Sequence, residues 1–307
     1  MWKLSGGIFL GWGLGSNDFA NIFGTSVSAG LIRYRTAILL CAFFLLLGAC
    51  LEGPKCMDTV GRFTELSGIT AFICTLSSAI VITILTYLAL PASASQAIIG
   101  ALLGACAVAG SMNFVKLYKI VLCWVLSPFG SLILSMSLYW LLGLLFRRLR
   151  QNHYWYKACL TSGVVVAGCY GAYSLGANNV ANVTGVYAGT GMISPLAASV
   201  IGGLSMASGV LTYSYKVMET VGKKIVPLDA FSAFVATLAN ALSLHIFTQT
   251  GVPVSATQTI IGAVIGVGLS RDYRTVSKKM ITVIGLGWVV TPLSAGVITY
   301  LALRVFH

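Results

Sequence analysis

Two short polar motifs lie within the apolar stretches of this chain, and both contain residues able to bind ions. The first, GSNDFAN, covers residues 15–21, and the second, GANNVAN, covers residues 176–182. Carboxylate and carboxamide oxygens coordinate hard cations, while carboxamide N–H groups donate hydrogen bonds to anions. The two motifs therefore predict ion-binding chemistry in apolar surroundings.

Asp18 is the only acidic residue deep in an apolar stretch. A carboxylate at the bilayer centre costs about 2.5–3.5 kcal/mol on insertion scales, so such a residue is expected to face a cavity or a partner. We expect a site for a coupling cation or proton at Asp18; the alternative is a carboxylate that caps the half-helix after it. The matching residue of the second motif, Asn179, keeps an oxygen ligand but carries no charge.

Four further carboxamides flank these two positions at matched places. They can coordinate a cation through oxygen or donate N–H groups to an anion, as helix breaks near the midplane of transporters often do. The alternative is ordinary hydrogen bonding between helices. Their repetition favours a function in ion binding for all four: Asn17, Asn21, Asn178 and Asn182.

A second pair of motifs, PASASQ at 91–96 and PVSATQ at 253–258, places hydroxyl groups directly after a proline. Proline followed by Ser or Thr opens a helix, whose first N–H groups are unpaired and whose dipole end is positive. Two such ends brought together would hold an anion without any Lys or Arg. Taken singly, each motif is an ordinary helix N-cap. The candidate anion-binding residues are Ser93, Ser95, Gln96, Ser255, Thr257 and Gln258.

The motifs recur in the same order in the two halves of the chain. The offset is 161 residues for the first pair, 161 for MDTVG at 57–61 and METVG at 218–222, and 162 for the proline motifs. Such regularity indicates an internal duplication, which often places a binding site at matching positions. We expect a first membrane repeat at 1–146, a basic connecting loop at 147–157 and a second membrane repeat at 158–307.

The composition predicts an all-α, polytopic membrane protein. Of the 307 residues, 57% are hydrophobic and 8% are charged, too few to cover a water-soluble globule. At roughly 20 residues per span, the length accommodates about eight to eleven spans. The segments 95–110 and 257–270 are short for a crossing, so we expect them to be re-entrant. The two halves then have opposite orientations, with helices broken at the motifs.

The charged residues and cysteines exclude several other functions. The 19 Lys and Arg residues lie in short connections, typical of topology signals rather than a nucleic-acid-binding face. More of these basic residues lie on one side of the membrane than on the other, and basic residues favour the cytoplasmic side, so we expect both termini outside the cell.

A membrane enzyme would need a nucleophile, metal cluster or acid/base pair, and three scattered His residues with one deep carboxylate do not supply it. The eight cysteines form no C-x-x-C pair and are expected to pack.

The motifs resemble the duplicated G-A-N-D-x-A-N signature of the inorganic phosphate transporter family, and the resemblance extends over nearly the whole chain. It implies phosphate uptake by symport with Na⁺ or H⁺, alternating access, an inverted-repeat fold and a possible homodimer in the cell membrane. The resemblance implies that Asp18, Asn21, Asn179 and Asn182 line the cation and substrate site, and that the residues after the two prolines hold the anion. We expect the cation, Na⁺ or H⁺, at Asp18 and Asn179 with Asn17 and Asn178, and the substrate at Asn21 and Asn182.

Two departures from the family pattern concern the substrate. The family usually has Asp where this chain has Asn179, and it usually has His where this chain has Gln96 and Gln258. A carboxylate can accept the proton of hydrogen phosphate, whereas sulfate carries no proton and needs donors alone. Since the family includes sulfate permeases, sulfate is the alternative substrate. A passive anion channel is the more distant alternative.

Overall fold

The computed structural model describes residues 1–64, 66–110, 112–149, 151–224, 228–271 and 278–306, and all their regular elements are helical. The first half of the chain contains η1 (Trp2–Leu4), α1 (Ser5–Ser28), α2 (Tyr34–Glu52), α3 (Pro54–Gly61), α4 (Gly68–Tyr87), α5 (Ala94–Ala109) and α6 (Phe114–Leu149). The second half contains α7 (His153–Val180), η2 (Ala181–Gly185), α8 (Val186–Gly189), α9 (Pro195–Tyr213), α10 (Tyr215–Lys224), α11 (Ala230–Gln249), α12 (Ala256–Arg271) and α13 (Lys278–Phe306).

Seven helices in the described part of the chain are long and apolar enough to cross a membrane, which confirms the all-α polytopic class. They comprise α2, α4, α6, α7 with its continuation, α9, α11 and most of α13. This number is below the eight to eleven expected, because the 24-residue α1 is not apolar enough and the 16-residue α5 and α12 are too short. Large apolar side chains along α2, α6 and α13 are exposed, as lipid contact requires.

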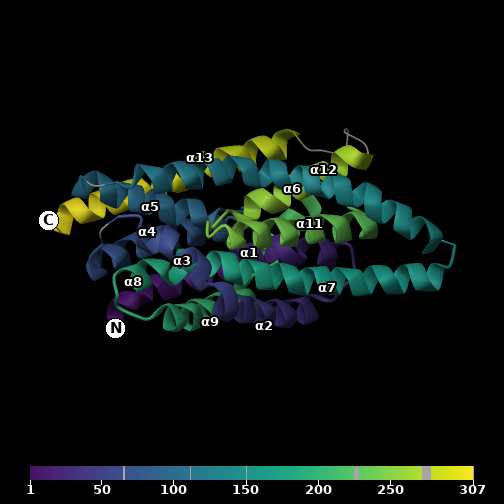
Figure 1. The fold of residues 1–307 in the computed structure, drawn as a ribbon, viewed down its shortest axis with the longest axis horizontal. Coiled ribbons are helices and arrows are strands. Elements are labelled where there is room, and N and C mark those ends of the chain that lie inside the picture. Colours follow the sequence, from purple (N-terminus) through teal and green to yellow (C-terminus); the bar gives the residue numbers. More distant parts are fainter. Residues whose placement is uncertain (65, 111, 150, 225–227, 272–277, 307) are drawn as a thin grey trace.

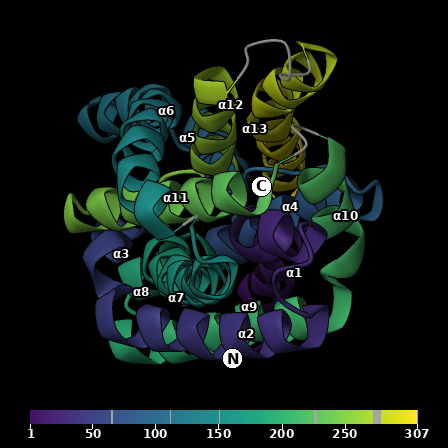
Figure 2. The same cartoon turned by 90° about the vertical axis from the view of Figure 1, so that its right-hand side faces the viewer.

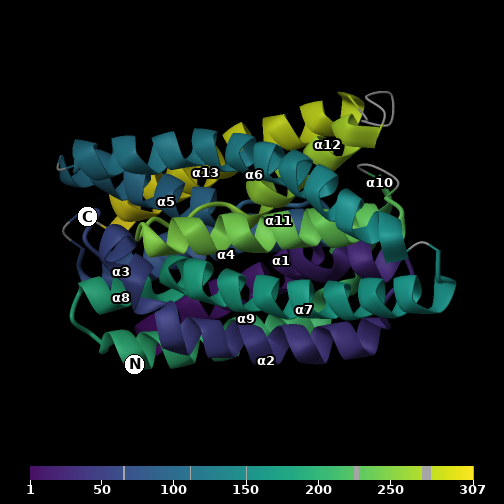
Figure 3. The same ribbon diagram turned by 45° about the vertical axis from the view of Figure 1, so that its right-hand side comes forward.

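The helices run along the length of the molecule and form layers that lie on one another (Figures 1 and 3). One layer contains α5, α6, α12 and α13, where α5 packs on α13 and α12 packs on α6. The opposite layer contains α2 and α9, which pack against each other and against α7 and α1. Each half of the chain therefore supplies helices to both layers, and the packing pairs recur with the halves exchanged.

The two helices that carry the polar motifs lie in the interior. Figure 2, an end-on view, shows α1 and α7 side by side between the two layers. The chain is continuously buried over residues 13–26 in the first half and over residues 174–187 in the second. These two ranges are offset by the same 161 residues as the motifs. Both motifs are thus held at the centre of the protein.

The prediction of helices broken at the motifs is correct only in part. α1 continues as an α-helix through its motif, whereas the second motif leads into the π-helical turn η2 at Ala181–Gly185. The polar side chains of the first motif reach their partners from within this continuous helix, as described below. The sequence also predicts interruptions of the last long helix of each half, at Pro128 and near Pro292; these are absent, since both residues lie inside continuous helices.

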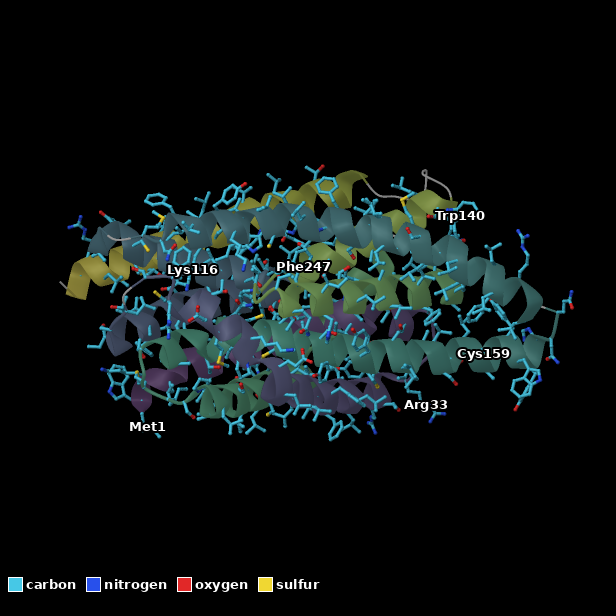
Figure 4. The ribbon with its side chains drawn as sticks, in the orientation of Figure 1. Met1, Arg33, Lys116, Trp140, Cys159 and Phe247 are labelled. Atoms are coloured by element: carbon cyan, nitrogen blue, oxygen red, sulfur yellow. The ribbon has the colours of Figure 1, made fainter. Side chains whose placement is uncertain are left out.

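The short helices α5 and α12 return to the end of the bundle from which the preceding helix starts. Asp229, the N-cap of α11, forms an ion pair of 3.6 Å with Arg271 at the end of α12. Likewise, Thr70 near the start of α4 and Ala109 at the end of α5 line one surface pocket. Figure 4 shows Phe247, near the end of α11, well inside the length of the bundle. These hairpins agree with the expected re-entrant segments.

The labelled residues of Figure 4 show the direction of several helices. Met1 and Lys116 lie toward one end of the bundle, while Arg33, Trp140 and Cys159 lie toward the other. α1 and α6 therefore run in one direction, and α7 starts at the opposite end. α6 extends to Leu149 and α7 begins at His153, so helices occupy much of the expected loop at 147–157.

Two glycines permit close helix crossings in the hairpin layer. A Cβ atom on Gly100 of α5 would collide with the backbone of Pro292 in α13, and one on Gly262 of α12 would collide with the backbone of Pro128 in α6. Close backbone approach at small residues is a common means of packing helices in membranes. Each re-entrant helix is thus fixed against the last long helix of the other half.

We predict that Gly100→Ala and Gly262→Ala each lower the free energy of unfolding by about 1–3 kcal/mol, because the added methyl forces the helices apart. Gly143→Ala is the matched control: a Cβ there meets nothing within 4 Å, and Ala favours the helix. Thermal unfolding in detergent micelles measures all three. Equal stability of Gly143→Ala and the two crossing variants would contradict the packing argument.

Candidate ion-binding site

The structure brings all twelve predicted site residues together in the buried interior, where none is more than 3% exposed. They come from four segments: the motif helix α1, the motif helix α7 with its continuation η2, and the starts of α5 and α12. Complete burial makes hydrogen bonding decisive, because an unpaired polar group inside a protein costs about 1–3 kcal/mol. The bonds of each side chain therefore show which of its atoms remain for an ion.

Asn17 holds the extended segment that precedes α5. Its Nδ2 atom donates to Thr86 Oγ1 at 2.9 Å and to the Leu90 carbonyl at 3.0 Å. Its Oδ1 atom accepts from the Ala92 N–H at 2.9 Å. The side chain thus supplies partners for backbone groups that no helix or sheet satisfies.

Asn178 makes the equivalent contacts in the second half of the chain. Its Nδ2 atom donates to Thr248 Oγ1 at 3.0 Å and to the Val252 carbonyl at 3.4 Å, while Oδ1 accepts from the Val254 N–H at 2.9 Å. Because both ends of Asn17 and of Asn178 already have protein partners, this geometry assigns them to positioning the chain. It does not support the expectation that they bind the cation.

Asn21 and Asn182 connect the two halves. Asn21 Nδ2 donates to Asp18 Oδ1 at 2.9 Å and to Thr257 Oγ1, across the site, at 3.2 Å. Asn182 Nδ2 donates to Asn179 Oδ1 at 2.8 Å and to Ser95 Oγ, also across the site, at 3.0 Å. Each motif helix therefore binds the hydroxyl at the start of the other half's re-entrant helix.

The hydroxyl groups of Ser95 and Thr257 complete this exchange of hydrogen bonds between the two halves. Thr257 Oγ1 donates to the Ala92 carbonyl at 2.7 Å, and Ser95 Oγ donates to the Val254 carbonyl at 2.9 Å. A hydroxyl has a single proton. The shorter bond to Val254 therefore takes the Ser95 proton in preference to Asn179 Oδ1 at 3.3 Å. The two extended segments thus lie side by side.

Four buried carboxamide oxygens of the site residues remain without a hydrogen-bond partner. They are Oδ1 of Asn21 and Asn182 and Oε1 of Gln96 and Gln258, two from each half. Buried oxygens that face no donor are suited to a hard cation or to a protonated oxyanion. Asp18 adds the one negative charge; no cluster of three or more His, Cys, Asp or Glu residues occurs within the described ranges.

The starts of α5 and α12 supply donors for an anion. Ser93 Oγ accepts from the Gln96 N–H at 3.2 Å, and Ser255 Oγ accepts from the Gln258 N–H at the same distance. Both serines are thus helix N-caps, which is the role predicted for each motif taken singly. The backbone N–H groups before Gln96 and Gln258 still lie at two positive helix ends. An anion between these ends would meet donors from both halves.

Sequence reasoning missed Asn240 in α11. Its Nδ2 atom donates to the Asn21 carbonyl at 3.0 Å, and its Oδ1 accepts from Thr259 Oγ1 at 2.6 Å. The equivalent residue of the first half is Ser78, so the motif comparison gave no signal. A lone Asn within the apolar stretch at 229–250 was the available sign.

We predict that Asn17→Ala lowers the free energy of unfolding by about 2–4 kcal/mol, because it leaves the Leu90 carbonyl and the Ala92 N–H without partners. Asn113→Ala is the control: this exposed residue caps α6, and its loss costs about 1 kcal/mol. Chemical denaturation in micelles compares them. An Asn17→Ala protein as stable as the control would show that this clamp, the bonds of Asn17 to Leu90 and Ala92, contributes little to the stability of the fold.

The model of the phosphate transporter family matches this chain twice, at residues 14–162 and 150–299. The fold is that of a solved structure titled "The sodium-dependent phosphate transporter": the TM-score is 0.87 at 24% identity, and the match covers 100% of both chains. This likeness confirms the fold of the chain.

Several curated proteins are similar in sequence. Two named "Putative phosphate permease", from Pyrococcus furiosus and Methanocaldococcus jannaschii, are 30% and 31% identical, and each match covers 95% of this chain and 92% of the relative. A sulfate permease from Bacillus subtilis is 28% identical, over 97% of this chain and 86% of its own. By its duplicated match to the family model and by these relatives, the chain belongs to the phosphate transporter family.

Proposed function

We propose that this protein takes up inorganic phosphate by symport with a cation, Na⁺ or H⁺, and catalyses no covalent reaction. The observation that carries the proposal is the buried exchange between halves, in which each signature carboxamide binds the start of the other half's re-entrant helix. Family membership and the phosphate permeases among its relatives support the substrate.

The cation is proposed to bind beside Asp18. Asn21 occupies one carboxylate oxygen, Oδ1, and no donor from the described residues meets Oδ2. The unpartnered oxygen of Asn21 lies on the same helix, one turn away. An anionic oxygen beside a neutral one suits Na⁺, and a proton on Asp18 is the alternative. The name of the solved relative, a sodium-dependent transporter, supports Na⁺ as the first ion to test.

The phosphate is proposed to bind between the N-terminal ends of α5 and α12. Two helix dipoles and their free N–H groups stabilise a negative charge there without a basic side chain. Gln96 and Gln258 follow the first N–H groups, with unpartnered oxygens that can accept a phosphate proton. A cation beside Asp18 would offset the charge of the anion, so binding of the two ions is expected to be cooperative.

Alternating access accounts for the complete burial of the site better than a channel does. No predicted site residue is more than 3% exposed, whereas a channel needs a continuous path for its ion. We infer two inverted repeats, near 1–146 and 158–307, because α1 and α7 run in opposite directions (Figure 4). Rocking of one hairpin against the motif helices would open the site to one side at a time.

The location and assembly of the protein follow from the same proposal. We place it in the cell membrane with both termini outside, as the distribution of basic residues indicates. A homodimer is the expected assembly. Sulfate is the second candidate substrate, supported by the sulfate permease among the relatives and by Asn179, which replaces a proton acceptor with a donor.

The test is uptake of radiolabelled phosphate into proteoliposomes with an inward Na⁺ or H⁺ gradient. We predict accumulation against the phosphate gradient by the wild type, abolished by an ionophore. Asp18→Asn should lose this accumulation while remaining folded, because the amide keeps the shape of the carboxylate and removes its charge. Asp58→Asn is the matched control, since this carboxylate is 62% exposed.

The outcomes separate the candidates. Gradient-driven accumulation by Asp18→Asn at the wild-type level would disprove the coupling role of Asp18. Uptake that follows only the phosphate gradient in the wild type would identify a passive channel. Transport of labelled sulfate in place of phosphate would identify a sulfate permease.

A further inference from the structure

The two halves of the site differ in charge at one position. Asp18 and Asn179 are equivalent residues, and the side chain one turn later binds each of them in the same way, through Oδ1. The difference is confined to the second terminal atom, which is an oxygen in Asp18 and the Nδ2 amide in Asn179. The other ten site residues carry no charge in either half.

The neighbours of Asn179 fix the orientation of its amide. Its Oδ1 atom accepts from Asn182 Nδ2 at 2.8 Å. If this amide alone were turned over, two NH₂ groups would face each other with no acceptor between them. If the amides of Asn179 and Asn182 were both turned over, Ser95 Oγ would have to donate to Asn182, and its one proton would be lost from the 2.9 Å bond to the Val254 carbonyl. The Nδ2 atom of Asn179 therefore points away from Asn182, and it is buried without any hydrogen-bond partner.

An unpaired buried NH₂ group in the ion site points to a ligand with an acceptor atom. A protein interior penalises such a donor unless a bound species satisfies it. A cation is repelled by an N–H dipole, whereas an oxyanion oxygen accepts from it. The corresponding oxygen of Asp18, Oδ2, attracts a cation and repels an oxyanion.

We propose that Asn179 donates a hydrogen bond to the transported oxyanion at the place where a second carboxylate would bind a second cation. Each anion then crosses with one coupling cation fewer than a site with two carboxylates would require. This inference rests on the proposed function and specifies the ion balance of the same site. In effect, the first half binds the cation and the second half adds a donor for the anion.

The test is the net charge carried per phosphate. Proteoliposomes are held at a series of membrane potentials with K⁺ and valinomycin, and the equilibrium accumulation of labelled phosphate is measured at each. Asn179→Asp keeps the acceptor for Asn182, and its new buried charge calls for a counter-ion. We expect it to carry one more positive charge per phosphate than the wild type. Its KM for phosphate at low cation concentration should rise about tenfold, since a donor to the anion is lost.

A double variant tests whether the number of carboxylates sets the number of cations. Asp18→Asn combined with Asn179→Asp moves the single carboxylate to the other half, and we expect it to regain the wild-type charge ratio that Asp18→Asn alone loses. Asn152→Asp is the control for the same chemical change: this exposed residue caps α7 and should keep the wild-type ratio.

Each result has a defined meaning. An unchanged charge ratio in an active Asn179→Asp protein overturns the inference while leaving the proposed function intact. Absence of coupled uptake in the wild type is instead a failure of the proposed function. If Asn179→Asp is folded but inactive, the number of coupling cations bound per purified chain decides, measured as bound ²²Na⁺ for a Na⁺-driven wild type or as proton uptake for a H⁺-driven one. One ion more than wild type supports the inference, and an equal number overturns it.

Discussion

The structure depends on satisfying the backbone of two extended segments deep inside a membrane protein. Neither segment lies in a helix, and lipid offers no hydrogen bonds, so side chains supply partners for backbone groups that the neighbouring helix ends leave open. Asn17 and Asn178 each bind the segment of their own half. The hydroxyls of Ser95 and Thr257 each bind the segment of the other half. These reciprocal bonds join the halves at the same point where both re-entrant helices begin.

The same constraint determines where ions can bind. Among the twelve site residues, all of which the structure describes, the buried atoms left without a partner are four carboxamide oxygens and the Asn179 amide, and the Asp18 carboxylate is bonded to one of these carboxamides. Helix starts from both halves add backbone donors beside them. Cation ligands and anion donors thus lie together in one enclosed region. Their proximity gives a direct physical reason for coupling, because each ion reduces the electrostatic cost of binding the other.

The motifs predicted the location of the site better than the role of each residue. Asp18, Ser95 and Thr257 could be assigned to a buried polar centre because duplication places functional residues at matching positions. Asn17 and Asn21 are alike in the sequence, however, and only their partners distinguish a backbone clamp from an ion-site residue. Those partners lie 69 to 236 residues away, so no local pattern specifies them.

The central claim is that phosphate binds where the starts of α5 and α12 meet, beside the signature carboxamides. A structure of the protein with phosphate and Na⁺, determined by electron cryomicroscopy in lipid nanodiscs, tests it most directly. We predict one tetrahedral density between these helix ends, within hydrogen-bond distance of Asn179 Nδ2 and the N–H groups of both first turns. Density for phosphate only at the basic ends of the bundle, with the buried centre unchanged, would contradict the account.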